Sequence, residues 1–271
     1  MPDLSVVIVS YNTRDLLRDC LLSLRTSEGL KLEIIVVDNA SSDGSADMVR
    51  AEFPEVRLLA QSLNTWFCGG NNIGIRAAAS DVVLLLNPDT EAAPDALALM
   101  HRFLRENPDY AGVTAQMRYP DGRVQLTCSS QTSYPQLLLN HSVLGYLLPS
   151  WKRQSRDRQF YADWDRLSDR DVDVMPGSCS MMRREDILLD EDLLLYFPED
   201  SLARKLTRKC RFLAAARIRH HEKSSTRSFF ATRIFFRDML VYCRKQYGIA
   251  PMLLMWLLSR PIYWLMWLKN R

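Results

Sequence analysis

The sequence lacks the cysteine patterns of zinc-binding or redox-active domains. Its six cysteines are scattered, no Cys-x-x-Cys pair occurs, and no cysteine and histidine are spaced as in a zinc site. We therefore expect neither structural zinc nor a disulfide framework. Scattered thiols of this kind are typical of reduced, cytosolic proteins, so we expect a cytoplasmic location.

We also expect no secretory signal. Met1, Pro2 and Asp3 lead straight into an apolar run, without the basic stretch that begins a signal peptide. The chain has 271 residues, of which 47% are hydrophobic and 25% charged. This is enough for one large α/β domain with a sizeable core, and widespread disorder is not expected.

Acidic residues are scarce in the last quarter of the chain. Residues 203–271 contain 16 Lys and Arg but two acids, whereas residues 1–202 contain 19 basic and 30 acidic residues. We expect this basic part to meet an anionic membrane, a diphosphate or a nucleic acid, although a solvated basic face is the alternative. Nucleic acid is the weakest of these, because no nucleic-acid-binding motif is present, and we expect no such partner.

The sequence has one long hydrophobic run, residues 251–268, and this run is interrupted. Arg260 lies at its middle, where a charge costs about 2.5–3.5 kcal/mol even on a lenient insertion scale. Pro261 favours a kink or a break. Because tryptophan and flanking basic residues prefer the headgroup region, we predict helices that lie in the membrane interface rather than a span. Packing on the protein's own core is the alternative.

The first 116 residues alternate between two periodicities. Short apolar runs predict five strands, and the residues between them repeat at helical spacing; the runs are 4–10, 32–37, 56–60, 82–86 and 111–116. This alternation predicts βαβ units in a mostly parallel sheet flanked by helices. Ligands bind beyond the carboxyl ends of such strands, so we expect the chemistry in the loops after Val9, Val37 and Leu86.

Other elements are less regular. The spacing of apolar residues predicts helices at 69–79, 93–105, 201–209 and 228–247, and a further strand-like run at 172–184. Residues 119–171 are polar without a clear period, which indicates a long connection or lid.

Two of the three loops carry an aspartate. Asp38 ends the second strand, and its carboxylate can accept hydrogen bonds from a base or a ribose; shaping a turn is an equally good interpretation. Asp89 follows Asn87 and Pro88 at the end of the fourth strand. A lone carboxylate with open coordination positions suits Mg²⁺ or Mn²⁺ shared with phosphates, and a simple Pro-Asp turn is the alternative.

Glycines and histidines give weaker signals. Gly69 and Gly70 open a predicted helix, whose N-terminus favours negative charge. His220 and His221 are adjacent, so at most one of them is expected to be a ligand.

Four motifs occur in order: Val-Ile-Val-Ser-Tyr-Asn at 7–12, Val-Val-Asp-Asn-Ala-Ser-Ser-Asp-Gly-Ser at 36–45, Gly-Asn-Asn-Ile-Gly-Ile at 70–75 and Leu-Leu-Leu-Asn-Pro-Asp-Thr at 84–90. Together they resemble the family 2 inverting glycosyltransferases of the GT-A fold, in particular the bacterial rhamnosyltransferase-like branch. Weaker blocks at 177–184, 195–200 and 218–225 extend the resemblance over residues 4–227.

The resemblance implies a role for each matching residue. The nucleotide and donor site would consist of Ser10, Tyr11, Asp38, Asp43, Gly70, Asn71 and Asn87. Asp89 and His221, or else His220, would hold Mg²⁺ or Mn²⁺ at the diphosphate. Glu199 or Asp200 would be the general base.

The sequence departs from the family at two places. Trp66 replaces a glycine beside the donor in the family's Glu-Asn-x-Gly-Phe, which would alter or block the donor pocket. The family's Glu-Asp-x-Asp-Leu aligns without a gap so that Glu199 falls on the catalytic aspartate. A one-residue shift keeps the two adjacent acids instead, and this slightly favours Asp200.

The implied reaction is one displacement, in which a base deprotonates an acceptor hydroxyl that attacks the anomeric carbon. The resemblance implies dTDP-rhamnose as donor and a polyprenyl-diphosphate-linked glycan as acceptor, in O-antigen or other cell-surface polysaccharide synthesis at the inner face of the membrane. We expect a GT-A domain at 1–227, with a nucleotide-sugar half (1–116) and an acceptor half (117–227), and a membrane-associating helical segment at 228–271. A catalytically impaired sugar-nucleotide-binding or scaffold protein is the alternative.

Overall fold

The computed structural model describes residues 1–221 and 229–269. The expected boundary at residues 227 and 228 lies outside the described residues, and the division into domains stays a prediction. The N-terminal half alternates strands and helices as predicted: β1 (Leu4–Ser10), α1 (Arg14–Arg25), β2 (Leu32–Asp38), α2 (Ser45–Glu52), β3 (Arg57–Ala60), α3 (Trp66–Ala77), β4 (Val82–Leu86), β5 (Thr90–Ala92), α4 (Ala96–Glu106) and β6 (Tyr110–Arg118).

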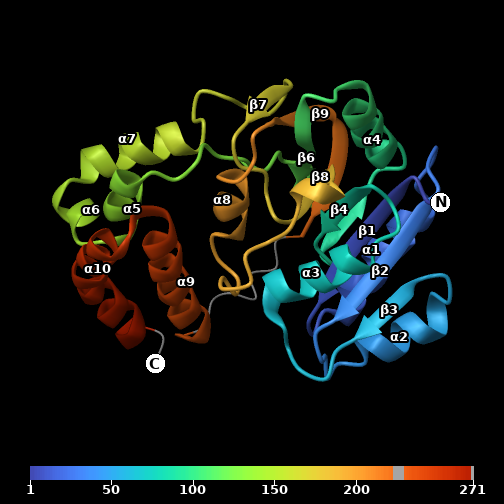
Figure 1. Cartoon of the computed structure of the whole chain (residues 1–271), viewed down its shortest axis with the longest axis horizontal. Coiled ribbons are helices and arrows are strands. Elements are labelled where there is room, and N and C mark those ends of the chain that lie inside the picture. Colours follow the sequence, from blue (N-terminus) through green and yellow to red (C-terminus); the bar gives the residue numbers. More distant parts are fainter. Residues whose placement is uncertain (222–228, 270–271) are drawn as a thin grey trace.

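The C-terminal half contains more helix than the sequence indicates. Its elements are α5 (Tyr134–His141), α6 (Leu144–Leu147), α7 (Pro149–Gln159), β7 (Arg170–Val172), β8 (Cys179–Arg183), α8 (Pro198–Ala203), β9 (Lys209–His220), α9 (Phe229–Tyr247) and α10 (Ile249–Lys269). Figure 1 shows the sheet with α1, α2 and α4 on the right, a group formed by α5, α6, α7, α9 and α10 on the left, and α8 between them.

One sheet runs through the molecule in the order β3-β2-β1-β4-β8-β6-β9-β5, with β7 paired to β9. The ladders among β3, β2, β1 and β4 are parallel, whereas β8 is antiparallel to both β4 and β6. The predicted α/β architecture with a central sheet flanked by helices is confirmed. The sheet is parallel in its first half and mixed beyond β4.

Two apolar cores cover the two faces of the sheet. Val6 and Ile8 of β1 face one core, which includes residues of α1, α2 and α4, and Val7 faces the other, which includes α3, α8, α9 and α10. A strand that is buried on both faces reads as a continuous apolar run, which is why β1 is visible in the sequence. On the second face, α3 lies so close to β1 that a Cβ on Gly70 would come within 2.8 Å of Val9.

Several predicted elements are corrected. Residues 119–171 are not a lid without structure, because a capping box between Ser133 and Gln136 begins α5 and two further helices follow. The basic helix predicted at 201–209 is wrong: α8 ends at Ala203, and Lys209 begins β9, where alternate residues are buried.

The last two helices form an antiparallel hairpin. Gly248, with φ +93°, separates α9 from α10, a conformation that glycine adopts without strain. The helix α10 continues through Pro261, so the chain does not break there, although an interior proline removes one backbone hydrogen bond. The hairpin packs on α5 and α6, where Val143 N–H donates to the Leu258 carbonyl (3.1 Å) and the Tyr134 hydroxyl donates to the Pro251 carbonyl (2.8 Å).

Candidate active site

The loops after β1 and β2 are joined to each other at the edge of the sheet. Asn12 N–H donates to Ser41 Oγ (2.9 Å), and Ser42 N–H donates to Asn12 Oδ1 (2.8 Å). In the ladder, Ser10 and Asp38 are direct neighbours. Because β4 lies on the other side of β1, the residues that follow β4 share this edge.

Asp38 has an oxygen without a partner. Its side chain is buried, and Oδ2 accepts a hydrogen bond from Ser41 N–H (3.1 Å), whereas Oδ1 has no hydrogen-bond donor among the described residues. A buried acceptor left unpaired costs about 1–3 kcal/mol. An N–H or O–H group of a ligand would remove this cost, and Asp38 is therefore suited to bind a nucleoside.

The other residues predicted to hold the nucleoside differ in the hydrogen bonds that they already make within the protein. Ser10 is buried and shares a hydrogen bond with Thr13 Oγ1 (2.9 Å), whereas the Tyr11 ring is 52% exposed at the mouth of the loop. Asp43 accepts hydrogen bonds from Arg14 N–H (2.9 Å) and from Ser45 N–H (3.0 Å) and Oγ (2.6 Å). Burial raises the pKa of Asp43, but these hydrogen bonds outweigh it and the net shift is downward. The structure thus gives Asp43 a role in bracing the loops.

Gly70 and Asn71 lie inside α3 rather than in an open glycine-rich loop. Gly70 allows α3 to approach Val9, and the buried Asn71 donates from Nδ2 to the Phe67 carbonyl (2.8 Å). Both are structural in these contacts, and their proximity to a donor stays a prediction. Gly70 is therefore explained by the close packing of α3 on β1.

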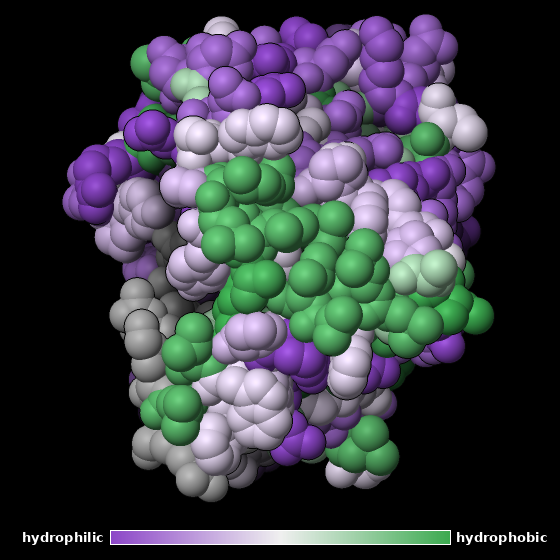
Figure 2. Space-filling model, turned by 90° about the vertical axis from the view of Figure 1, so that its left-hand side faces the viewer, coloured by the Kyte–Doolittle hydropathy of each residue, from purple (hydrophilic) through white to green (hydrophobic). Residues whose placement is uncertain are grey.

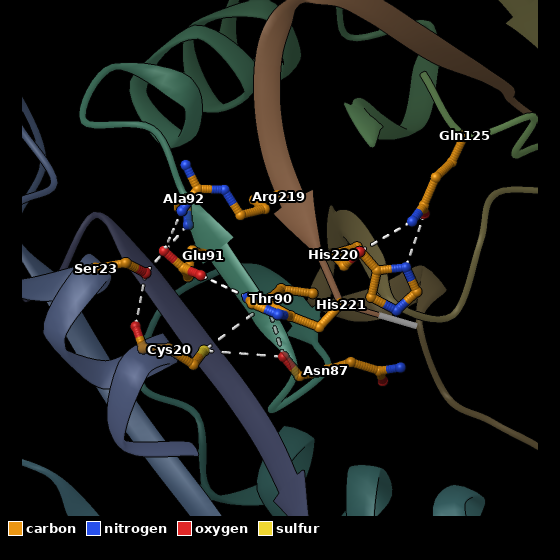
Figure 3. A network of polar contacts seen from close by, with 10 residues as sticks. All are labelled: Cys20, Ser23, Asn87, Thr90, Glu91, Ala92, Gln125, Arg219, His220 and His221. Atoms are coloured by element: carbon orange, nitrogen blue, oxygen red, sulfur yellow. Dashed lines mark hydrogen bonds and ion pairs between the residues drawn. The ribbon is translucent and has the colours of Figure 1, made fainter. Parts of the chain in front are cut away.

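Two histidines meet the loop after β4 through different contacts. His220 ends β9, and its Nε2 lies 3.5 Å from Asp89 Oδ1. His221 turns to Glu91, with 2.6 Å between Nε2 and Oε1, and its backbone N–H donates to the Asp89 carbonyl (2.9 Å). Figure 3 shows the two rings pointing to different partners, and the Asn87 backbone carbonyl accepts a hydrogen bond from Thr90 Oγ1 (2.7 Å). The geometry therefore brings His220, and not His221, to the Asp89 carboxylate.

Gln125 determines how His220 is oriented. Its Nε2 donates to the His220 carbonyl (3.0 Å), and its Oε1 lies 2.8 Å from His220 Nδ1. Since Oε1 can only accept, Nδ1 must carry the hydrogen. Nε2 therefore faces Asp89 while Nδ1 is held by an acceptor, which is the orientation of a histidine that ligates a metal.

Asp89 and His220 fit a divalent cation that is shared with a substrate. Both side chains are 14% exposed, and carboxylate oxygen with imidazole nitrogen suits Mn²⁺ or Mg²⁺. Among the described residues no cluster of three or more potential metal ligands exists. Two protein ligands at most would therefore leave most coordination positions to phosphate oxygens and water.

Glu199 and Asp200 face different surroundings. Asp200 Oδ1 accepts a hydrogen bond from Thr132 N–H (2.8 Å), and burial raises its pKa. Glu199 lies against Gly177, where its Oε1 occupies the space that a Cβ at that position would need. Burial raises the pKa of Glu199 to about 7, which is where a general base is most effective near neutral pH.

Asp238 of α9 holds the segment that precedes Glu199. This fully buried carboxylate accepts hydrogen bonds at Oδ2 from the backbone N–H groups of Leu194 (3.0 Å), Leu195 (2.8 Å) and Tyr196 (3.0 Å). Sequence reasoning missed both Asp238 and Gln125. The signal for Asp238 was present, because it is one of two acids in the basic C-terminal segment.

The backbone conformation at Trp66 suits glycine, the residue that the family it resembles has at this position. Its φ is +64°, a left-handed conformation that is strained for a bulky residue. Asn39 Nδ2 donates to the Trp66 carbonyl (3.0 Å) and stabilises this turn. The ring stacks on Phe230 of α9, with centroids 5.8 Å apart, so it links the start of α3 to the C-terminal hairpin.

A hollow of about 620 Å³ lies between α1 and β9, where Asp19, Glu91 and Arg219 contribute to its wall. Neither Asp38 nor Asp89 lines this hollow. We therefore place the candidate site at the sheet edge and not in this larger depression. All six cysteines are free and buried, as expected for reduced thiols.

The chain is similar in sequence to known glycosyltransferases. The family model described as "Glycosyl transferase family 2" matches residues 5–188. An N-acetylglucosaminyl-diphospho-decaprenol L-rhamnosyltransferase of Mycobacterium tuberculosis is 26% identical over 243 residues, which are 82% of this chain and 77% of that protein. The uncharacterized glycosyltransferase YibD of Escherichia coli is 32% identical over 178 residues, which are 63% of this chain and 49% of that protein.

Solved structures are similar in fold. A mannosyltransferase from Pyrobaculum calidifontis, in complex with GDP-Man and Mn²⁺, has a TM-score of 0.60 at 17% identity and covers 92% of this chain and 66% of its own. Residues 1–349 of TarS from S. aureus have a TM-score of 0.56 at 17% identity and cover 89% of this chain and 65% of their own. At this identity the likeness establishes the GT-A type of fold.

Proposed function

This chain belongs to glycosyl transferase family 2, and from that premise we propose that it transfers rhamnose or another hexose from a nucleoside diphosphate to a polyprenyl-diphosphate-linked glycan, with inversion at the anomeric carbon. The observation that carries the proposal is the unpartnered Oδ1 of the buried Asp38 at the sheet edge that also holds Asp89. The M. tuberculosis relative, whose name gives a lipid-linked acceptor and a rhamnosyl group, supports the choice of substrates.

The donor base would bind at Asp38. A carboxylate oxygen needs a donor, and thymine and uracil present N3–H in that position whereas cytosine presents an acceptor. This chemistry supports a dTDP- or UDP-linked sugar, with dTDP-rhamnose as the donor that we propose. Tyr11, exposed at the same mouth, is suited to cover the base.

Asp89 and His220 would hold Mg²⁺ or Mn²⁺, and His221 stays a weaker prediction because Glu91 engages its ring. When bound, the cation neutralises charge on the leaving diphosphate. The side chain of Gln125 would hold the His220 ring in the orientation that directs Nε2 toward Asp89.

Glu199 is the general base that we propose, in preference to Asp200. Asp200 already accepts a hydrogen bond from Thr132 and lies beside Arg204, whereas the raised pKa of Glu199 leaves it able to take a proton near pH 7. The carboxylate of Glu199 would remove the proton from the acceptor hydroxyl, whose oxygen attacks the anomeric carbon on the face opposite the nucleotide.

The C-terminal hairpin would place the enzyme on the inner face of the cell membrane. Residues 249–268 form one helix that is long and apolar enough to cross a membrane, and 17% of it is buried. Arg260 lies between Trp256 and Tyr263, 5.3 and 5.0 Å from their ring centroids. A cation held among amphipathic rings suits the interface better than the bilayer centre.

Titration calorimetry with nucleoside diphosphates tests the proposal. We expect dTDP or UDP to bind in the presence of Mn²⁺, and CDP more weakly. Asp38→Ala should abolish base selectivity, and Asp89→Ala should abolish the gain in nucleotide affinity that Mn²⁺ gives. Asp15→Ala, which removes an exposed carboxylate of α1, is the control. If no nucleotide binds under any condition, the proposed transferase activity is refuted and the scaffold function becomes the better explanation.

A further inference from the structure

A second cavity lies away from the sheet edge, among the helices on the left of Figure 1. It has a volume of about 350 Å³, within the range of about 300–1,000 Å³ that is usual for small-molecule sites. Aromatic and aliphatic side chains form most of its wall, including Tyr146 of α6, Phe235 of α9, and Ile262 and Met266 of α10. Among the described residues, Lys152 of α7 is the lysine or arginine in its wall, and His141 of α5 also lines it.

The cavity is electropositive. Lys152 Nζ lies 5.1 Å from the centroid of the Tyr146 ring. The positive charges of Lys152 and Arg156 also disfavour protonation of the buried His141. Burial, aided by these two cations, lowers the pKa of His141 to about 4, so the imidazole is neutral near pH 7. Within residues 1–221 and 229–269, no ion pair engages Lys152 or Arg156. The positive charge is therefore available to an anionic ligand.

The inner wall of the cavity belongs to the segment that carries the proposed base. Tyr196 lines the cavity and stands three residues before Glu199. Its ring packs edge to face on Phe235, with centroids 5.1 Å apart, and Phe197 lies 5.6 Å from the same ring. A ligand in the cavity would thus lie next to the segment that leads into α8, the helix that carries Glu199.

The outer side of the cavity continues into an exposed apolar surface. Figure 2 shows a broad hydrophobic patch on this side of the molecule. Residues with large exposed apolar side chains here are Leu147 (72%), Trp151 (65%), Leu257 (60%) and Leu268 (64%). A patch this extensive marks an interaction site. A surface of this kind, next to a positive cavity, fits an apolar chain that ends in phosphate.

We propose that this cavity is the subsite for the lipid end of the acceptor: it binds the diphosphate and the first isoprene units of a polyprenyl diphosphate. This inference rests on the proposed function and adds the place where the acceptor is held. Lys152, with Arg156 beside it, contacts the diphosphate, and the Tyr146, Phe235 and Met266 side chains contact the isoprene units. The rest of the chain passes over the exposed face of α10 into the membrane, and the glycan extends past Tyr196.

Binding of short isoprenoids to the full chain tests this site. The probes are farnesyl diphosphate, farnesol and inorganic diphosphate, with affinities measured by calorimetry below the aggregation concentration of the lipid. We expect farnesyl diphosphate to bind best, and Lys152→Ala to weaken it about tenfold through loss of a charge-assisted contact. Arg153→Ala, which removes the same charge one residue away on an exposed position, should change it less than about twofold. Met266→Trp should weaken both farnesyl ligands by filling the cavity.

Three results would overturn the proposal. These are equal affinity for farnesol and farnesyl diphosphate, equal effects of Lys152→Ala and Arg153→Ala, and no binding of farnesyl diphosphate at all. Nucleotide binding with Mn²⁺, measured on the same preparations, separates this inference from the proposed function. Farnesyl diphosphate that fails to bind a chain that still binds dTDP refutes the cavity alone. A chain that binds farnesyl diphosphate but no nucleotide refutes the transferase.

Discussion

Removing the Asp238 carboxylate should release the segment before Glu199 without unfolding the protein. In Asp238→Ala, three backbone N–H groups lose their acceptor, and Arg237, 2.6 Å from Oδ1, loses its partner. Breaking a buried charged network costs about 3–5 kcal/mol. Since domains are stable by about 5–15 kcal/mol, most molecules stay folded. Residues 194–196 would keep other contacts, such as the hydrogen bond from Phe67 N–H to the Leu194 carbonyl (3.0 Å).

Hydrogen exchange measures this release directly. At about 1.4 kcal/mol per factor of ten, the loss corresponds to exchange that is faster by about two to four orders of magnitude at residues 194–196. Turnover should fall because Glu199 is no longer held, while nucleotide affinity stays unchanged. Asp192→Ala is the matched control: it removes a 66% exposed carboxylate paired with Lys245, worth about 0–1 kcal/mol. If peptides spanning 194–196 exchange equally in Asp238→Ala and wild type, Asp238 does not position this loop and the reasoning is wrong.

Four other changes have expected outcomes. Gly177→Ala places a methyl group where Glu199 Oε1 lies, so we expect kcat to fall with little change in Tm, because a flexible side chain moves aside. Gln125→Ala should weaken Mn²⁺ affinity about 10–100-fold by freeing His220, measured by calorimetry. The pKa of Glu199 predicts that kcat/KM rises with pH through about 7. It also predicts that the free energy of unfolding falls as pH rises from 4.5 toward about 7, because the folded state favours the protonated carboxyl. A flat pH profile of either quantity contradicts the corresponding prediction. Trp66→Gly should relieve about 1–2 kcal/mol of left-handed strain, offset by the lost stack, so Tm should change little.

The strands were predictable where burial on both faces leaves a continuous apolar run. β1, β2 and β4 are such strands, and they also position Asp38 and Asp89, so the site edge could be read from the sequence. The helix α5 has one fully buried apolar residue, Leu137, and its periodicity is therefore too weak to recognise. The basic helix predicted at 201–209 fails because α8 ends at Ala203, and Arg204, Lys205 and Arg208 lie in the segment that leads to β9.

The partners of the positioning residues were beyond sequence reasoning for a different reason. Gln125 contacts His220 across 95 positions in the chain, and Asp238 reaches residues 42–44 positions earlier. No local pattern reports such pairs, because their partners are set by the sheet order and by the packing of α9. The choice between Glu199 and Asp200 likewise depends on Thr132, which is 68 positions from Asp200.

The C-terminal hairpin contacts the segment that leads to the proposed base. α9 supplies Asp238 to the loop before Glu199, and Phe230 to Trp66 at the start of α3. α10 covers the same core and exposes the apolar face next to the second cavity. Any force on the hairpin from a membrane would therefore act on residues 194–199 through α9. We therefore expect that binding of α10 to a membrane would affect turnover through α9, which packs on α10 and holds the segment before the proposed base.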